Sequence, residues 1–257
     1  MDVILEPKRI TKFFTFFVIL FSILHILGQC VAFTLGREGA TEPFIRLTNL
    51  DVERSIPTLF SFVLLLTCSF FLFIIASAKR KDGEGYMYWL VLSVIFLFLS
   101  IDESLMTHEG LMEKLRTLLN TSGYFYFAWV IPYGIGLIAF LLVYTKFLFK
   151  LPYKTRLLFI IAGSVYISGA IGLELVGGRC YELYGEHSLS FVILFTIEEI
   201  LEMSGTVLFI YALTSYMDSE LKCSRFLMNR IIVPESIKPV MQNTIKHILN
   251  SFHHFAI

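Results

Sequence analysis

Charged residues are scarce in this chain. Asp, Glu, Lys and Arg make up 16% of its 257 residues, and their formal charges cancel to zero. Soluble domains carry about 25% charged residues, so the composition argues against an ordinary water-facing surface. A neutral chain also lacks the basic stripe of a nucleic-acid-binding protein, and we expect no nucleic acid partner.

Motifs of known enzyme chemistry are also missing. The sequence contains no H-E-x-x-H, G-x-S-x-G, phosphate loop, G-x-G-x-x-G or Glu-x-x-His pair, so no familiar catalytic class is indicated. The four cysteines show no C-x-x-C spacing, which argues against the usual zinc and redox motifs. We expect them to stay unpaired, with a disulfide between Cys30 and Cys180 as the alternative.

Apolar sequence, by contrast, is abundant, at 56% of the residues. A membrane span needs about 20 mostly apolar residues. Six stretches fit, at 13–35, 56–78, 86–105, 124–147, 157–176 and 190–217. The first is longer than the apolar region of a signal peptide, so we interpret it as an uncleaved span. The sequence therefore predicts an all-α polytopic membrane helix bundle with six transmembrane helices, short loops and the lipid bilayer as its main partner.

The placement of Lys and Arg predicts the topology. Of the 21 such residues, 15 lie in the N-terminus, the second loop, the fourth loop and the tail. Basic loops face the cytoplasm, so both termini are predicted there. This gives a six-helix transmembrane domain at 1–217 and a cytoplasmic tail at 218–257. Apolar residues at helical spacing between Ile237 and Phe252 favour an interfacial helix on the inner leaflet. Packing of the tail on the bundle or a partner is the alternative.

Acidic residues interrupt the apolar stretches near their outer ends. Asp102, Glu174 and Glu202 each lie about 24–26 Å from the inner end of their span, at 1.5 Å per residue. Isolated charges are costly in hydrocarbon, so we expect a shared site inside the bundle. A continued third helix would place Asp102, Glu109 and Glu113 on one face. The candidate ligands are Asp102, Glu103, His108, Glu109, Glu174, Glu198, Glu199 and Glu202.

No Lys or Arg occupies the predicted spans at that depth. Clustered carboxylates would then be neutralised by protons or by a bound cation. The first functional interpretation is therefore a cation- or proton-binding site with a role in transport, and a divalent metal ion is the candidate cofactor. A membrane-embedded metal-dependent enzyme acting on a lipid-borne substrate and a structural accessory subunit are the alternatives. Interfacial acids hydrated by water, with a structural role, are the simplest interpretation.

Four further features predict architecture rather than chemistry. His25 is expected to be a hydrogen-bonded core residue, and Asp51 to cap the second span ahead of Pro57. Pro132 is expected to kink the fourth span. Small residues recur at every fourth position of the fifth span and predict a close helix contact; they are Ser164, Ser168 and Gly172.

Three sequence blocks resemble an uncharacterised family of bacterial six-span integral membrane proteins. The blocks are NLDVERSIPTLFS at 49–61, FLSIDESLMTHE at 98–109 and EEILEM at 198–203. The resemblance covers about residues 13–217 and leaves out the tail. It implies a location in the cell inner (plasma) membrane, and it implies no activity.

Overall fold

The computed structural model describes residues 6–50, 52 and 55–221, except for the side chain of Glu109. Regular secondary structure in these ranges is helical. The helices are α1 Pro7–Leu35, α2 Glu42–Thr48, α3 Ile56–Lys81, α4 Met87–Leu105, α5 Thr107–Leu119, α6 Val130–Lys150, α7 Tyr153–Ile167, α8 Glu174–Tyr184 and α9 Leu189–Glu220. A π-helical turn at Ser168–Leu173 joins α7 to α8. Tail residues 222–257, including the predicted interfacial helix, lie outside the described residues.

Five helical segments are long and apolar enough to cross a membrane. They are α1, α3, α4, α6 and the continuous stretch Tyr153–Tyr184. An all-α membrane bundle is therefore supported, whereas six spans are not confirmed. The sixth predicted span forms α9, which is 32 residues long but is not among the five. Many of its side chains are buried against other helices, so its status as a span stays a prediction.

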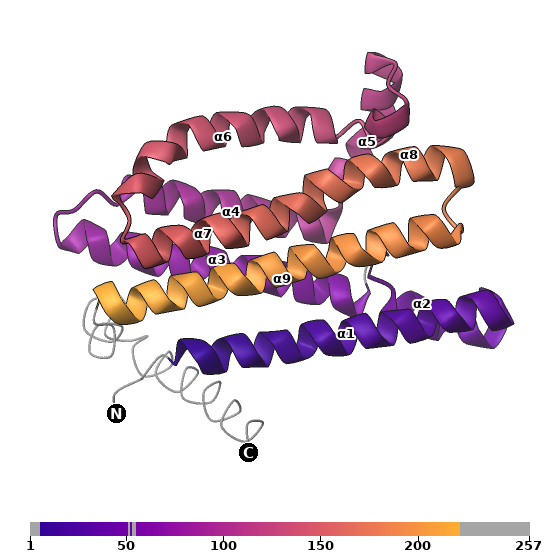
Figure 1. The fold of residues 1–257 in the computed structure, drawn as a ribbon, viewed down its shortest axis with the longest axis horizontal. Helices are drawn as coiled ribbons and strands as arrows, with labels where there is room; N and C mark the ends of the chain where they lie inside the picture. Colours follow the sequence, from indigo (N-terminus) through magenta and orange to yellow (C-terminus); the bar gives the residue numbers. More distant parts are fainter. Residues whose placement is uncertain (1–5, 51, 53–54, 222–257) are drawn as a thin grey trace, which may run out of the picture.

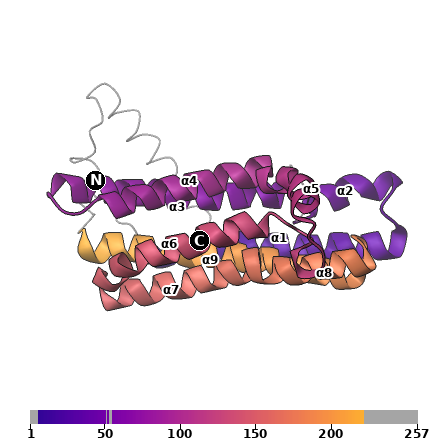
Figure 2. The same cartoon turned by 90° about the horizontal axis from the view of Figure 1, so that it is seen from above.

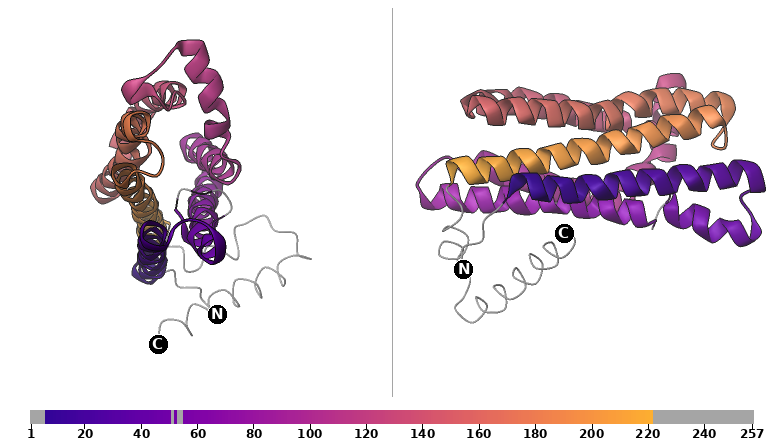
Figure 3. Two further views of the ribbon diagram at one scale, coloured as in Figure 1. Left: turned by 90° about the vertical axis from the view of Figure 1, so that its right-hand side faces the viewer. Right: turned by 60° about the horizontal axis from the view of Figure 1, so that its bottom comes forward.

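The long helices run along one axis in two layers (Figures 1 and 2). One layer contains α3 and α4, and the other contains α1, α9 and α7–α8 (Figure 3). The start of α1, the α3–α4 loop, the α6–α7 connection and the end of α9 meet at one end of the bundle, on the left in Figure 1. Because α3 ends there with Lys79, Arg80 and Lys81, we name it the basic end. Helices α2 and α5 lie toward the opposite end, which we name the far end.

Near the basic end, the two layers contact each other through fully buried side chains. Leu72, Ile75, Leu213 and Met217 have no exposed surface. Helices α3 and α4 are also joined by two reciprocal hydrogen bonds of 2.8 Å, from Ser69 Oγ to the Ser93 carbonyl and from Ser93 Oγ to the Ser69 carbonyl. Small hydroxyl residues allow close approach of helices in a membrane, so this pair fixes the α3–α4 contact.

Helix α9 closely approaches α7 and the π-helical turn at two glycines. A Cβ atom on Gly205 would lie 2.6 Å from the Tyr166 nitrogen, and one on Gly169 would lie 2.8 Å from the Glu198 carbonyl oxygen. The contact predicted at Ser164, Ser168 and Gly172 is wrong, because these three residues are exposed. The close contacts are made instead by Gly169 and by Gly205, which lie on different helices and therefore show no spacing of four in the sequence.

His25 joins three segments at the level where the bundle begins to widen. Its side chain is 1% exposed. Its Nδ1 accepts a hydrogen bond of 3.2 Å from the Leu50 amide, so its Nε2 carries the proton and donates to Thr196 Oγ1 at 3.0 Å. The prediction of a hydrogen-bonded core histidine is confirmed. It ties α1 to α9 and to the chain that precedes α3.

Two local predictions fail at helix ends. Pro132 does not kink a helix, because α6 begins at Val130 and the proline lies in its first turn, where no amide partner is required. Ser55, rather than Asp51, caps α3 by accepting a hydrogen bond from the Thr58 amide, and Pro57 lies in the first turn as expected. Asp51 lies outside the described residues.

Cys30, Cys68 and Cys180 are free, so the Cys30–Cys180 disulfide does not form.

Candidate functional site

A cavity of about 820 Å³ occupies the widened half of the bundle. Its walls come from α4, α5, α6, α7, the π-helical turn, α8 and α9. Helix α6 leaves room for it because aromatic side chains space α6 from α4 nearer the basic end. Tyr144 donates a hydrogen bond of 3.0 Å to the Tyr88 carbonyl, and Phe147 packs against Tyr88 and Trp89 with ring centroids 5.1 Å apart in each pair.

Seven of the eight candidate ligands line this cavity. They are Asp102, Glu103, His108, Glu174, Glu198, Glu199 and Glu202. The eighth, Glu109, has no described side chain. Residues from four separate helices thus meet at one place, although they lie up to a hundred positions apart in the sequence. Glu113 does not join them, because it lies on the exposed surface of α5.

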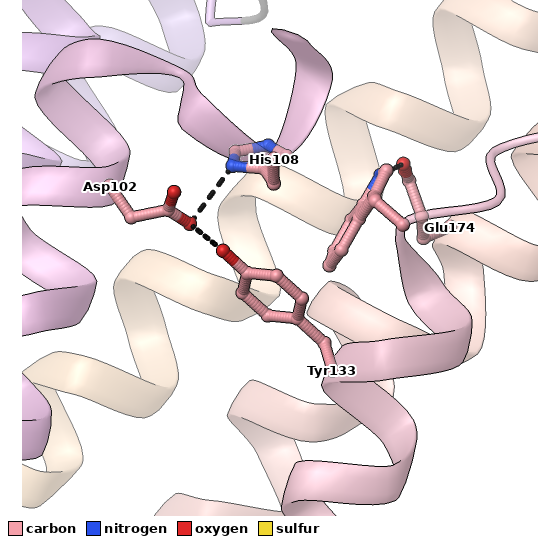
Figure 4. A network of polar contacts seen from close by, with 5 residues as sticks. Asp102, His108, Tyr133 and Glu174 are labelled. Atoms are coloured by element: carbon pink, nitrogen blue, oxygen red, sulfur yellow. Dashed lines mark hydrogen bonds and ion pairs between the residues drawn. The ribbon is translucent and has the colours of Figure 1, made fainter. Parts of the chain in front are cut away.

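Asp102 and His108 meet because the chain breaks between them. Helix α4 ends at Leu105, and Met106 adopts a left-handed conformation with φ of 46° before α5 begins. The predicted continuous helix is therefore wrong. The break turns His108 back toward Asp102, and its Nδ1 lies 3.0 Å from Asp102 Oδ2 (Figure 4). Helix α6 adds Tyr133, whose hydroxyl donates to the same oxygen at 2.9 Å.

The second oxygen of Asp102 accepts no hydrogen bond from the described residues. Asp102 is 5% exposed, and its Oδ1 is buried without a partner. A buried carboxylate oxygen without a donor costs free energy. A bound ligand that carries a positive charge or a hydrogen-bond donor would satisfy it.

Glu174 begins α8 directly after the π-helical turn. Such a turn holds one more residue than an α-helical turn, so it changes which side chains face the bundle. Here it places Glu174 on the cavity wall, where Oε1 accepts a 2.8 Å hydrogen bond from the Trp129 indole (Figure 4). Glu174 also lies close to the carboxyl group of Glu198.

Helix α9 supplies the remaining acids from one continuous stretch. Glu198 and Glu202 are four residues apart and share a face, which is the face that Gly169 and Gly177 allow α7 and α8 to approach. Glu202 lies beside the Tyr166 side chain on α7. The glycines therefore hold the acids between helices instead of exposing them to lipid.

The cavity is strongly acidic. Its lining contains seven carboxyl groups and one histidine, and within the described chain no Lys or Arg contributes to it. Across residues 6–50, 52 and 55–221, no three His, Cys, Asp or Glu side chains are spaced so that they could hold a metal ion. The acids are spread over the wall of a large space.

Polarity changes along the length of the cavity. Acids and aromatic side chains surround its far end, whereas the end nearer the basic end is apolar. The apolar floor is formed by Phe96, Phe159 and Phe209, whose ring centroids lie 4.8 Å apart for Phe96–Phe209 and 4.7 Å apart for Phe159–Phe209. The cavity thus has one charged half and one apolar half.

Four lining residues were not predicted from the sequence. Trp129 and Tyr133 are one helical turn apart and pack edge to face, with ring centroids 5.0 Å apart. Tyr166 and Glu186 also line the cavity, and Glu186 reaches it from the loop before α9. Tyr133 and Trp129 lie at the outer end of a predicted span, where interfacial aromatic residues are common. Their spacing of four was the available signal.

Comparison with known proteins places most of the chain in one family. A family described as "Domain of unknown function (DUF8692)" matches residues 14–217. No curated protein and no solved structure matches the chain.

Proposed function

The chain belongs to the DUF8692 family, whose function is unknown, and we propose that it is a membrane protein that binds a cation in the acidic cavity. One observation carries this proposal. Seven carboxyl groups line a single cavity to which no described Lys or Arg contributes. Carboxyl groups gathered where no Lys or Arg contributes are stabilised by protons or by a bound cation, and the buried Asp102 Oδ1, which has no hydrogen-bond partner among the described residues, favours a ligand.

The proposed setting is the bacterial inner membrane with the basic end in the cytoplasm. The loops that gather at the basic end are those rich in Lys and Arg, and such loops remain inside. This proposal includes α9 as the sixth span, a transmembrane domain at 1–217 and a cytoplasmic tail at 218–257. The cavity then lies in the outer leaflet, and the packed core beneath Phe159 and Phe209 separates it from the cytoplasm. Transport of the bound cation would require that core to open.

Trp129 offers a direct test, because its indole is hydrogen-bonded to Glu174 at the cavity wall. Protein in lipid nanodiscs is titrated with Mn²⁺, Ca²⁺ and tetramethylammonium while tryptophan emission is followed, and bound metal is measured by elemental analysis. We expect a saturable change in wild type that is weakened at least tenfold in Glu198→Gln and Glu202→Gln.

Glu113→Gln is the matched control, because Glu113 is an exposed acid outside the cavity, and it should behave as wild type. Equal responses in all four proteins, or no response to any of the three cations, would contradict cation binding. An emission change that follows pH alone and is lost in Glu198→Gln would instead show that the acids bind protons and not a cation.

A second candidate function is catalysis on a lipid-borne substrate, and the Asp102–His108 pair favours it. If His108 Nδ1 donates to Asp102, its Nε2 carries the lone pair that accepts a proton from water or a hydroxyl group. Such a pair acts as a general base in many hydrolases. Incubating total lipid extract with wild type and with His108→Gln, followed by mass spectrometry, tests this reading. Identical lipid profiles would remove it.

A further inference from the structure

We infer that the cavity's ligand is an amphiphilic organic cation, with an ammonium-type head among the acids and an apolar body against the phenylalanine floor. This inference rests on the proposed function and adds the chemical class of the ligand. It follows from the shape of the cavity, the order of polar and apolar side chains along it, and the place where its wall reaches the lipid.

Size is the first argument. Pockets for drug-sized molecules measure about 300–1,000 Å³, and this cavity measures about 820 Å³. A desolvated inorganic ion or a proton would occupy a small part of it. An organic molecule would fill it and would allow several acids on different walls to face one charged group.

The charged half suits an ammonium head. Asp102 Oδ1 is buried and lacks a donor among the described residues. Close by, the rings of His108, Trp129 and Tyr133 are in mutual contact, with centroid separations of 4.7 Å for His108–Trp129 and 5.0 Å for Trp129–Tyr133. Aromatic faces beside carboxylates attract alkylated ammonium groups through cation–π and charge interactions.

The apolar half of the cavity suits the apolar body of such a ligand. On α9, Glu202 and Phe209 are seven residues apart, or about 10 Å along the helix axis. Over that distance the lining passes from acids to phenylalanine rings. A hydrated ion gains nothing from such a wall, whereas burial of a hydrocarbon chain against it is favourable.

The wall also opens toward lipid. Phe98 on α4 lines the cavity and is 56% exposed, and Pro132 and Gly136 on α6 line it and are exposed as well. These residues place an opening between α4 and α6 on the lipid-facing side of the bundle. An amphiphile dissolved in the outer leaflet reaches the cavity by this route without crossing water.

Two glycines offer positions at which a mutation can reduce the space in the apolar half of the cavity. Gly136 and Gly163 line the cavity, and a Cβ atom on either would meet nothing within 4 Å. A leucine at either helical position therefore begins in open space, and we use it to narrow the cavity. Alanine at the same positions is the matched control, since it adds one methyl group only.

The experiment uses quenching of Trp129 in the full-length protein in phosphatidylcholine nanodiscs. Three nitroxide probes carry the label at the head: a decyldimethylammonium nitroxide, a trimethylammonium nitroxide without the chain, and a neutral decyl nitroxide. Trp89, the other tryptophan, is 2% exposed in the packed core. Trp129→Phe therefore supplies the background signal.

We expect half-quenching by the long-chain cation at a concentration at least tenfold lower than by either other probe. Gly136→Leu and Gly163→Leu should weaken that probe at least tenfold, leave the short cation unchanged, and unfold at the wild-type temperature. Glu198→Gln with Glu202→Gln should weaken both cations. The alanine controls should match wild type.

The other outcomes separate the two proposals. Equal potency of the long and short cations, or no effect of the leucines on the long one, overturns the amphiphile and leaves the cation site standing. Equal potency of the neutral and cationic long-chain probes also overturns the inference, because the cavity would then hold a neutral lipid. Failure of both cations to exceed the neutral probe removes the inference, whereas the titration with Mn²⁺ and Ca²⁺ decides the proposed function separately.

Discussion

The two halves of this bundle follow opposite packing rules. Near the basic end, Leu72, Ile75 and Leu213 have no exposed surface and the layers touch. Toward the far end, helices α4 to α9 surround about 820 Å³ of space lined by acids. Between membrane helices, stability comes from van der Waals packing and hydrogen bonds. The comparison indicates that the packed half holds the fold together and that the hollow half is free to carry a site.

The largest expected effect is a core truncation in the packed half. Leu213→Ala should lower the free energy of unfolding by about 2–5 kcal/mol, because it leaves a void among fully buried neighbours. Leu137→Ala, on the cavity wall, should cost a small fraction of that. Unfolding in mixed micelles with increasing dodecyl sulfate measures both variants. Equal losses would show that the hollow half is as tightly packed as the other.

The next effect concerns the glycine that sets the α7–α9 distance. Gly205→Ala should cost roughly 1–3 kcal/mol, because its Cβ would lie 2.6 Å from the backbone nitrogen of Tyr166 and force the helices apart. Gly163→Ala, on α7 but facing open space, should be neutral. If both alanines were neutral, the two helices would have room to separate, and the acids between them would not be rigidly held.

A comparable or smaller loss is expected where the two halves meet. His25→Ala removes the acceptor of the buried Leu50 amide, which should cost roughly 1–3 kcal/mol. Thr196→Val, which leaves the His25–Leu50 hydrogen bond in place, should cost less. Thermal unfolding in nanodiscs compares them. A neutral His25→Ala would mean that the chain before α3 is not anchored to α1.

The smallest effect should have the opposite sign. Glu202→Gln removes an acid that faces other acids, so we expect a gain in stability of roughly 0.5–2 kcal/mol together with the loss of cation binding. Glu113→Gln should change neither. A loss of stability in Glu202→Gln would mean that the carboxylate supports the fold, which would blur the contrast between the halves.

Periodic features of the fold could be predicted from the sequence. The apolar stretches locate the helices, and the depths of Asp102, Glu174 and Glu202 predict one common level, because a helix has a fixed rise per residue. In the structure these three residues line one cavity. The order of helices around the cavity could not be predicted in this way. It depends on which faces touch, and Gly169 and Gly205 have no spacing that distinguishes them from other small residues.

Breaks in the helices were the main source of error. A left-handed methionine is uncommon, so Met106 carries no sequence signal for the end of α4. The π-helical turn at Ser168–Leu173 is equally unmarked, although it sets the orientation of Glu174. Both breaks flank the cavity. Local patterns therefore fail at the positions where tertiary contacts decide the backbone conformation.

The left-handed residues at either side of α5 uncouple that helix from its neighbours. Met106 precedes it and Asn120 follows it, both with positive φ, so unwinding of α5 cannot spread into α4. Asp102 belongs to α4, whereas His108 belongs to the first turn of α5. The distance between their side chains therefore reports the position of α5 relative to α4, and two spin labels, one on each helix, would measure it.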